Sequence, residues 1–162
     1  DQLEDRVVTV SSRAHENGDI DFDDPHSRVN YDRWEAYGQS KLANLLFAYE
    51  LDRRSDLTSL ACHPGFAATN LQNGAATSLP MRVVMGVINR VIAQSAADGA
   101  LPTLYAATDR DAEGGQYIGP NGLGQMRGAP EPQESTDRSY DEPLAKRLWT
   151  LSAAETEVTY PF

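Results

Sequence analysis

The chain is organised around the stretch WEAYGQSKLANLLF, residues 34–47. Its apolar residues recur at helical spacing and predict a helix from about Glu35 to Arg54. Side chains four residues apart lie on one face of a helix, so the phenol of Tyr37 is predicted to lie beside the ammonium of Lys41. A nearby cation favours the phenolate, and such a phenol can exchange a proton with an alcohol or carbonyl oxygen. The pair by itself is a hypothesis, because an exposed Tyr and Lys also reach this spacing by chance.

The composition suits one globular domain over residues 1–162. The chain is 40% hydrophobic and has 14 basic against 24 acidic residues, for a net charge of −10. This charge argues against nucleic acid or an anionic membrane surface as a partner. Arg outnumbers Lys 12 to 2 and Asp outnumbers Glu 14 to 10. A salt-rich cytoplasm screens such a surface, so a halophilic source is predicted, with ordinary acidic solubility as the alternative.

The single cysteine, Cys62, cannot form an internal disulfide, which predicts an intracellular, cytoplasmic protein. No apolar run reaches the length of a membrane helix, and no signal-peptide pattern is present. The sequence begins at Asp1 and runs almost directly into an apolar strand. That beginning predicts either a fragment or upstream residues that are missing here.

Two strands flank the predicted helix. Residues 6–10 are β-branched and apolar on both faces, as in a buried parallel strand, and residues 57–63 form a second apolar run that Pro64-Gly65 stops. Residues 13–33 are polar and predict a surface loop. Strand, helix and strand in this order predict a right-handed βαβ crossover and a doubly wound, Rossmann-like α/β sheet.

The rest of the chain predicts further α/β elements. Residues 81–93 have helical spacing, and Ser95 is predicted to cap a helix through residues 100–107. Residues 115–119 predict a short last strand, residues 129–135 a linker, and residues 143–152 a terminal amphipathic helix, so that residues 129–162 form a C-terminal linker and helix.

A candidate site follows from the ends of the two strands. Ser12 closes the first strand and Pro64-Gly65 closes the second, and ligands of open α/β sheets bind beyond the carboxyl ends of strands. A hydroxyl there could hydrogen-bond a substrate carbonyl while Tyr37 supplies the proton. The alternatives are a helix or turn cap for Ser12 and a plain turn for Pro64-Gly65.

Three motifs in this order resemble the short-chain dehydrogenase/reductase family: VVTVSS at 7–12, YxxxK at 37–41 and HPGxxxT at 63–69. The chain is most similar to the retinol-dehydrogenase and protochlorophyllide-reductase-like branch. Further similarities to that branch are SRAH after the strand, SKLAN at 40–44 and KRLW at 146–149. The resemblance covers almost the whole chain and implies the C-terminal half of a Rossmann-like oxidoreductase.

The resemblance implies a role for each matched residue. Ser12 would orient the substrate oxygen, and Tyr37 would be the general acid/base. Lys41 would hold the ribose hydroxyls of a nicotinamide cofactor, NAD or NADP, and favour the Tyr37 phenolate. Residues 70–93 would form a substrate lid, and the helix of Tyr37 would form a homo-oligomer interface. Tyr37 is implied to bind the cofactor together with Lys41. The residues implied at the nicotinamide ring and its carboxamide are Pro64, Gly65 and Ala67, and Thr69 is implied at the carboxamide or the phosphate end.

The departures from the family leave alternatives open. The N-terminal cofactor-binding βαβ half has no counterpart here, and Gly119–Gly124 lacks the following helix of a phosphate loop. A truncated, non-catalytic remnant that acts as a binding or dimerisation module is therefore a rival. A serine hydrolase using Ser12 with His15 or His63 is weaker, because no Gly-x-Ser-x-Gly elbow is present. Three scattered His and one Cys do not have the spacing of metal ligands.

Overall fold

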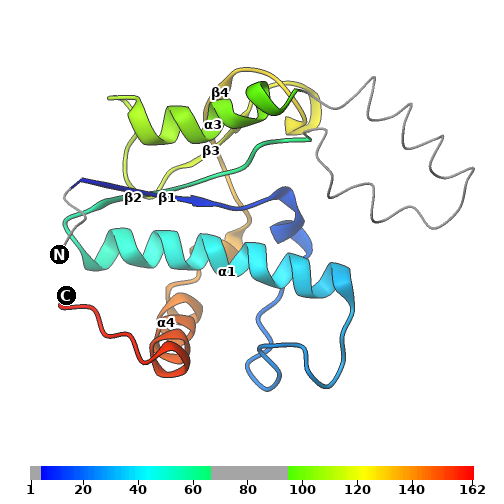
Figure 1. Cartoon of the computed structure of the whole chain (residues 1–162), viewed down its shortest axis with the longest axis vertical. Helices are drawn as coiled ribbons and strands as arrows, with labels where there is room; N and C mark the ends of the chain where they lie inside the picture. The colour runs from blue at the N-terminus through cyan, green and yellow to red at the C-terminus, as the bar shows by residue number, and fades with distance from the viewer. Residues whose placement is uncertain (1–4, 67–94) are drawn as a thin grey trace, which may run out of the picture.

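The computed structural model describes residues 5–66 and 95–162, which form a four-stranded sheet covered by helices (Figure 1). The strand order is β1-β2-β3-β4. Strands β1 (Arg6–Val10), β2 (Thr58–Cys62) and β3 (Tyr117–Pro120) are parallel, and β4 (Pro130–Gln133) pairs antiparallel with β3. The predicted α/β class and both of the first two strands are confirmed.

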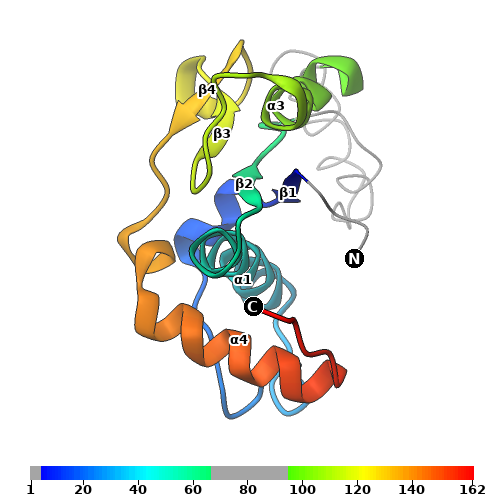
Figure 2. The same ribbon diagram turned by 90° about the vertical axis from the view of Figure 1, so that its left-hand side faces the viewer.

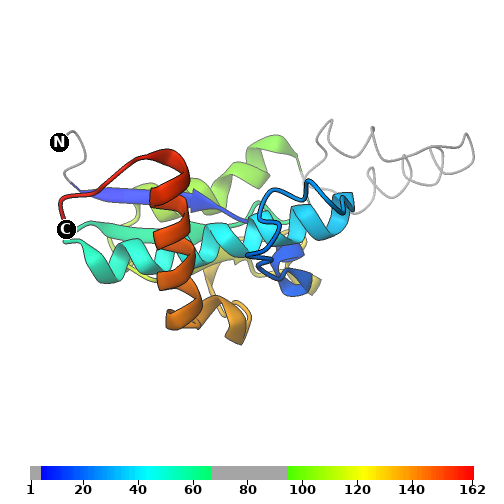
Figure 3. The same cartoon turned by 90° about the horizontal axis from the view of Figure 1, so that it is seen from below.

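Helices cover both faces of this sheet. Helix α1 (Arg33–Arg54) joins β1 to β2 on one face, and α3 (Ala96–Thr108) lies on the other (Figures 1 and 2). Helix α4 (Glu142–Thr156) crosses α1 on the side away from the sheet (Figure 3). This layering is the doubly wound arrangement that the strand-helix-strand order predicts.

The two sheet faces are built from alternating strand residues. Ala61 and Tyr117 are paired in register and pack with α1, whereas their neighbours Cys62 and Ile118 pack with Ala106 of α3. Successive side chains of a strand point to opposite faces, so β2 and β3 are buried on both faces and are mostly apolar, although Ser59 of β2 is a buried polar residue. This explains the continuous apolar runs in the sequence.

Helix α1 is buried on two sides. Leu45 and Tyr49 pack against the sheet, while Leu42 and Leu46 pack with Ala145 of α4. The helix begins after Asp32, whose carboxylate accepts the N–H groups of Trp34 at 2.8 Å and Glu35 at 3.1 Å. The apolar residues that recur at helical spacing form the buried face of this helix: Leu42, Leu45, Leu46, Tyr49 and Leu51.

Three details of the sequence prediction were wrong. Residues 13–33 are not only a loop, because they open with the short 3-10 helix η1 (Arg13–Asn17). Residues 129–135 are not a linker, because they contain β4, whose Pro130 and Pro132 suit an edge strand that needs few backbone donors. Strand β1 is only half-buried, since on one side no described strand pairs with it.

Other predicted elements are present with slightly different bounds, or they lie outside the described residues. Ser95 does cap α3, its hydroxyl accepting the Asp98 N–H at 3.1 Å, but the helix begins at Ala96. The last parallel strand begins two residues later and ends one residue later than predicted, and α4 is longer than residues 143–152 at both ends. The lid over 70–93 and the helix over 81–93 lie outside the described residues. In the part of the chain that is described, no helix has the length and apolarity to cross a membrane.

Candidate functional site

The site lies where β1 and β2 end side by side. The Ser11 N–H donates to the Cys62 carbonyl at 2.7 Å, and this is the last bond between the two strands. Beyond it the chain of β1 turns into η1 through Ser12, and the chain of β2 enters the turn at Pro64-Gly65. The two turns therefore leave the same carboxyl edge of the sheet, as the sequence predicts.

The Ser12 turn is held directly against α1. The Ser11 hydroxyl donates to the Lys41 carbonyl at 2.7 Å, and the Asn44 amide donates to the Val10 carbonyl at 2.9 Å. One helical turn before Lys41, the backbone of α1 at Gly38 touches the backbone at Gly18, which follows η1. A Cβ on Gly18 would overlap the Gly38 carbonyl. These contacts fix the position of Ser12 relative to the helix of Tyr37 and Lys41.

Tyr37 and Lys41 lie together on α1. The Lys41 ammonium is 5.5 Å from the centroid of the Tyr37 ring, and both residues are half-buried. Within residues 5–66 and 95–162, neither the phenol oxygen nor the ammonium has a hydrogen-bond or ion-pair partner. A phenol and an ammonium that are unpaired and adjacent suit a polyhydroxylated ligand such as a ribose.

Ser12 has the capping role that the sequence left open. It is the N-cap of η1, and its hydroxyl oxygen accepts the Ala14 N–H at 3.2 Å. The cap uses an acceptor lone pair and leaves the O–H free to donate. Capping therefore does not prevent Ser12 from hydrogen-bonding a carbonyl oxygen.

The Pro64-Gly65 turn is shaped by the loop that follows β3. Gly65 has φ of 67°, and a Cβ there would lie 2.5 Å from the Met126 carbonyl oxygen. The same carbonyl accepts the Phe66 N–H at 2.8 Å. Only glycine fits this position without strain. Ala67 and Thr69, which were predicted to lie near the cofactor, are outside the described residues.

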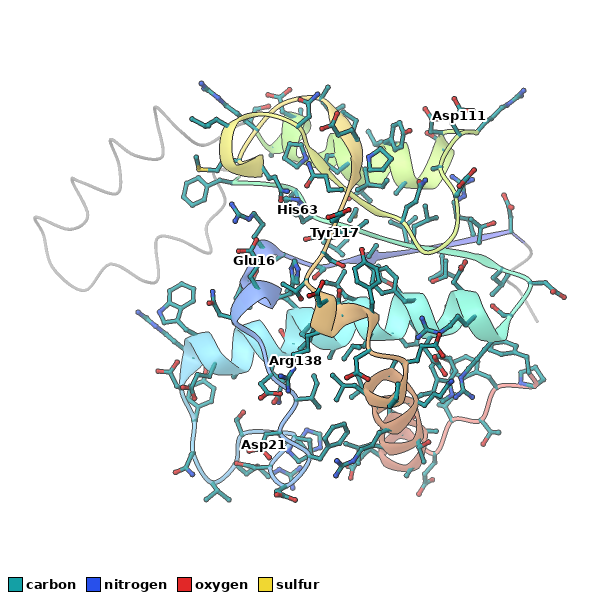
Figure 4. The ribbon with its side chains drawn as sticks, turned by 180° about the vertical axis from the view of Figure 1, so that it is seen from behind. Glu16, Asp21, His63, Asp111, Tyr117 and Arg138 are labelled. Atoms are coloured by element: carbon teal, nitrogen blue, oxygen red, sulfur yellow. The ribbon has the colours of Figure 1, made fainter. Side chains whose placement is uncertain are left out.

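Two buried histidines under these turns were not recognised from the sequence as parts of the site. His15 and His63 are 3% and 1% exposed, and their rings pack on Tyr117 with centroids 5.4 and 5.0 Å away. Figure 4 shows His63 and Tyr117 beside each other near Glu16 of η1. Burial lowers the pKa of both imidazoles, so both are neutral at neutral pH. The motifs SRAH and HPG contain them, but only packing shows what they touch.

These contacts do not suit a serine hydrolase. Nδ1 of His15 lies 2.7 Å from the carbonyl oxygen of Ser12, not its hydroxyl, and the ring is therefore not placed as a base for that hydroxyl. Among the described residues no cluster of His, Cys, Asp or Glu could hold a metal ion.

A separate cavity of about 690 Å³ lies beneath the Asp-rich loop. From α1 it is lined by Glu35, Ala36 and Gln39, on another face of the helix from Tyr37 and Lys41. The loop lines it with Asp19, Asp21, Asp23 and Asp24, and this acidic wall would repel the phosphates of a dinucleotide. The cavity therefore does not replace the candidate site.

Comparisons with known proteins agree on one group of enzymes. The chain is 38% identical over 156 residues to human retinol dehydrogenase 13 and 32% identical over 152 residues to human retinol dehydrogenase 14. It is 34% identical over 154 residues to polyprenol dehydrogenase of Danio rerio. These alignments cover 91%, 91% and 92% of this chain and 44%, 43% and 45% of the respective relatives. The chain thus spans less than half the length of the curated relatives that it matches.

A solved structure extends the comparison to the fold. The crystal structure of an uncharacterized protein from Mycobacterium paratuberculosis superposes with a TM-score of 0.75 at 39% sequence identity. The match covers 99% of this chain and 53% of that one. No protein-family model matches the chain.

Proposed function

The chain belongs to the retinol-dehydrogenase-like branch of the short-chain dehydrogenase/reductase family, and from this premise we propose that it carries the catalytic half of an NAD(P)-dependent oxidoreductase. The reaction is a reversible hydride transfer between the nicotinamide and an alcohol or its carbonyl. The observation that supports it most is the position of Lys41 over Tyr37, both unpaired in the described ranges, on a helix bonded to the Ser12 turn.

Each residue has a distinct task in this proposal. The Ser12 O–H donates to the substrate oxygen and orients it, while the capped oxygen keeps the side chain in place. The Tyr37 phenol gives its proton to that oxygen in reduction and takes it back in oxidation. The Lys41 ammonium, which lies over the Tyr37 ring, holds sugar hydroxyls of the cofactor.

The cofactor supplies the hydride chemistry, and the protein supplies position and a proton. Pro64, Gly65 and Ala67 are proposed to border the nicotinamide ring and its carboxamide, and Thr69 is proposed to contact the carboxamide or the phosphate end of the cofactor. The hydrogen bond from the Phe66 N–H to the Met126 carbonyl fixes the backbone directly after Pro64 and Gly65.

The first test is Tyr37→Phe in the full-length natural protein. Loss of the proton donor is expected to lower kcat by about 10²- to 10⁴-fold, the usual contribution of a general acid/base. The melting temperature is expected to stay unchanged, because the hydroxyl has no partner among the described residues. Tyr31→Phe is the matched control, since Tyr31 is 73% exposed on the preceding loop. Full activity in Tyr37→Phe would refute the proposed role.

The second test is Lys41→Ala with NADH and NADPH titrated by fluorescence. The variant is expected to bind the preferred cofactor more weakly and to turn over more slowly. Lys146→Ala is the control, because Lys146 is the other lysine of the chain and its ammonium pairs with Glu142 at 3.0 Å on α4. If Lys41→Ala bound cofactor like wild type, Lys41 would be only a surface charge. Binding of neither cofactor to the wild type would favour the non-catalytic module.

The substrate class and the oligomeric state are also proposals. A small alcohol or carbonyl compound is the proposed substrate. A homo-oligomer through α1 would have to use the part of the helix that α4 leaves free, because Phe47 of α1 stacks on Trp149 of α4 at 5.6 Å. A cytoplasmic location and a halophilic source stay predictions from composition.

A further inference from the structure

Each buried histidine is bonded through both ring nitrogens to groups that fix its protonation. Nδ1 of His15 lies 2.7 Å from the Ser12 carbonyl, which can only accept, so Nδ1 carries the hydrogen. Nε2 of His15 accepts the Thr136 N–H at 3.4 Å. His15 therefore joins the Ser12 turn to the segment that follows β4.

His63 makes the complementary pair of bonds. Its Nδ1 accepts the Gly65 N–H at 3.2 Å, and its Nε2 lies 3.2 Å from Gln133 Oε1. Gln133 donates its own amide N–H to the Pro120 carbonyl at 2.8 Å, which turns Oε1 toward the ring. Nε2 of His63 therefore carries the hydrogen, and His63 joins the Pro64-Gly65 turn to β4.

The backbone makes room for this arrangement at Gly119. A Cβ on Gly119 would overlap Nε2 of His63 and would lie 2.6 Å from Gln133 Oε1. The bare backbone of β3 thus lets the His63 ring reach β4. Between the two rings, Tyr117 stacks on His63 and meets His15 edge-on.

We propose that His15 and His63 are paired positioning residues, which hold the Ser12 turn and the Gly65 turn at their working separation by tying both to the segment 133–136. This inference rests on the proposed function, because it assigns those turns to one reacting centre. Neither ring acts as the acid or base, since both nitrogens of each ring are occupied. Neutral rings are required: a proton on Nδ1 of His63 would face the Gly65 N–H, and one on Nε2 of His15 would face the Thr136 N–H.

The charged and titratable surroundings of the rings are compatible with neutral imidazoles. On η1, Arg13 and Glu16 pair with each other at 2.7 Å, and Arg13 also donates to the Gly124 carbonyl at 2.6 Å. The α1 and β3 sides present the phenols of Tyr49 and Tyr117, whose pKa values burial raises, and the His15 ring lies close enough to contribute to lowering the pKa of His63. No described carboxylate forms an ion pair with either ring.

The kinetic test compares His63→Asn with His63→Leu in the full-length natural protein. The Asn side-chain oxygen can take the place of Nδ1 and accept the Gly65 N–H, whereas Leu keeps apolar contact with Tyr117 but has no acceptor. Displacing a reacting group by about 1 Å costs up to about 100-fold. We therefore expect kcat of the Leu variant to be at least about tenfold below that of the Asn variant. His26→Asn is the control, because His26 is exposed beside Glu155.

If His63 only filled space in the core, the apolar Leu would replace it at least as well as Asn does. The kcat of the Leu variant would then equal or exceed that of the Asn variant. Equal kcat values, or a faster Leu variant, would overturn the inference.

The second measurement uses the wild type and needs no activity. Long-range ¹H–¹⁵N correlation spectra of the imidazoles at neutral pH are expected to show the Nδ1–H tautomer for His15 and the Nε2–H tautomer for His63. Other tautomers, or averaging between them, would overturn the inference even in an active enzyme. A wild type that shows these tautomers but no turnover would instead refute the proposed function. The hydrogen bonds of His15 and His63 to the segment 133–136 would then still stand.

Discussion

The contact between Gly18 and Gly38 offers a direct test of how the site is held together. Gly18 closes η1 and Gly38 follows Tyr37 on α1, and their backbones touch. A Cβ on Gly18 would overlap the Gly38 carbonyl oxygen, lie 2.8 Å from its carbon and lie 3.0 Å from Leu42 Cβ. In contrast, a Cβ on Gly38 would be no closer than 3.1 Å to its nearest neighbour, the Ala14 carbonyl oxygen.

These distances set the expected size of the effect. Overpacking a tight contact costs about 1–3 kcal/mol. Replacing glycine by alanine also restricts the unfolded chain. This raises the free energy of unfolding by up to about 1 kcal/mol in either variant. Because its overlap is with backbone that must move, Gly18→Ala should lose about 2 kcal/mol of the free energy of unfolding. Gly38→Ala should stay within about 1 kcal/mol of wild type, since its helical position also gains propensity.

Thermal unfolding of both variants measures the difference. A loss of 2 kcal/mol corresponds to a melting temperature lower by about 4–8 °C for a chain of this size. Gly18→Ala should also lower kcat, because a displaced η1 moves Ser12 away from Tyr37. A Gly18→Ala variant as stable as wild type, or less damaged than Gly38→Ala, would refute the close backbone contact.

Two further predictions concern stability. Since burial lowers the pKa of His15 and His63, the unfolded chain binds protons that the folded one does not as pH falls below about 6.5. The free energy of unfolding should therefore drop with acidification by up to about 1.4 kcal/mol per pH unit for each histidine, and Asn at both positions should flatten this slope in urea titrations at pH 5.5 and 7. Asp32→Ala removes the N-cap of α1 and should cost about 1 kcal/mol, whereas Asp32→Ser should recover most of it; equal losses in both variants would contradict the capping role.

The sequence by itself determined the α/β class, the order of the first elements and the Tyr37–Lys41 pair. These features depend on local periodicity: β-branched runs specify strands, and a spacing of four residues specifies a shared helix face. The same local logic failed at residues 130–133, because a strand with two prolines is stable only when a neighbouring strand and an open edge are available.

The tertiary structure alone decided how the turns are held. Gly18 and Gly38 are 20 positions apart, and Gly119 is far from His63 in sequence, so neither close approach leaves a local signal. His15 and His63 looked like scattered polar residues until folding placed Tyr117 between them and gave each nitrogen a backbone or amide partner. The residue types that could react follow from sequence, whereas their separation follows from burial and hydrogen bonding between distant segments, which only packing creates.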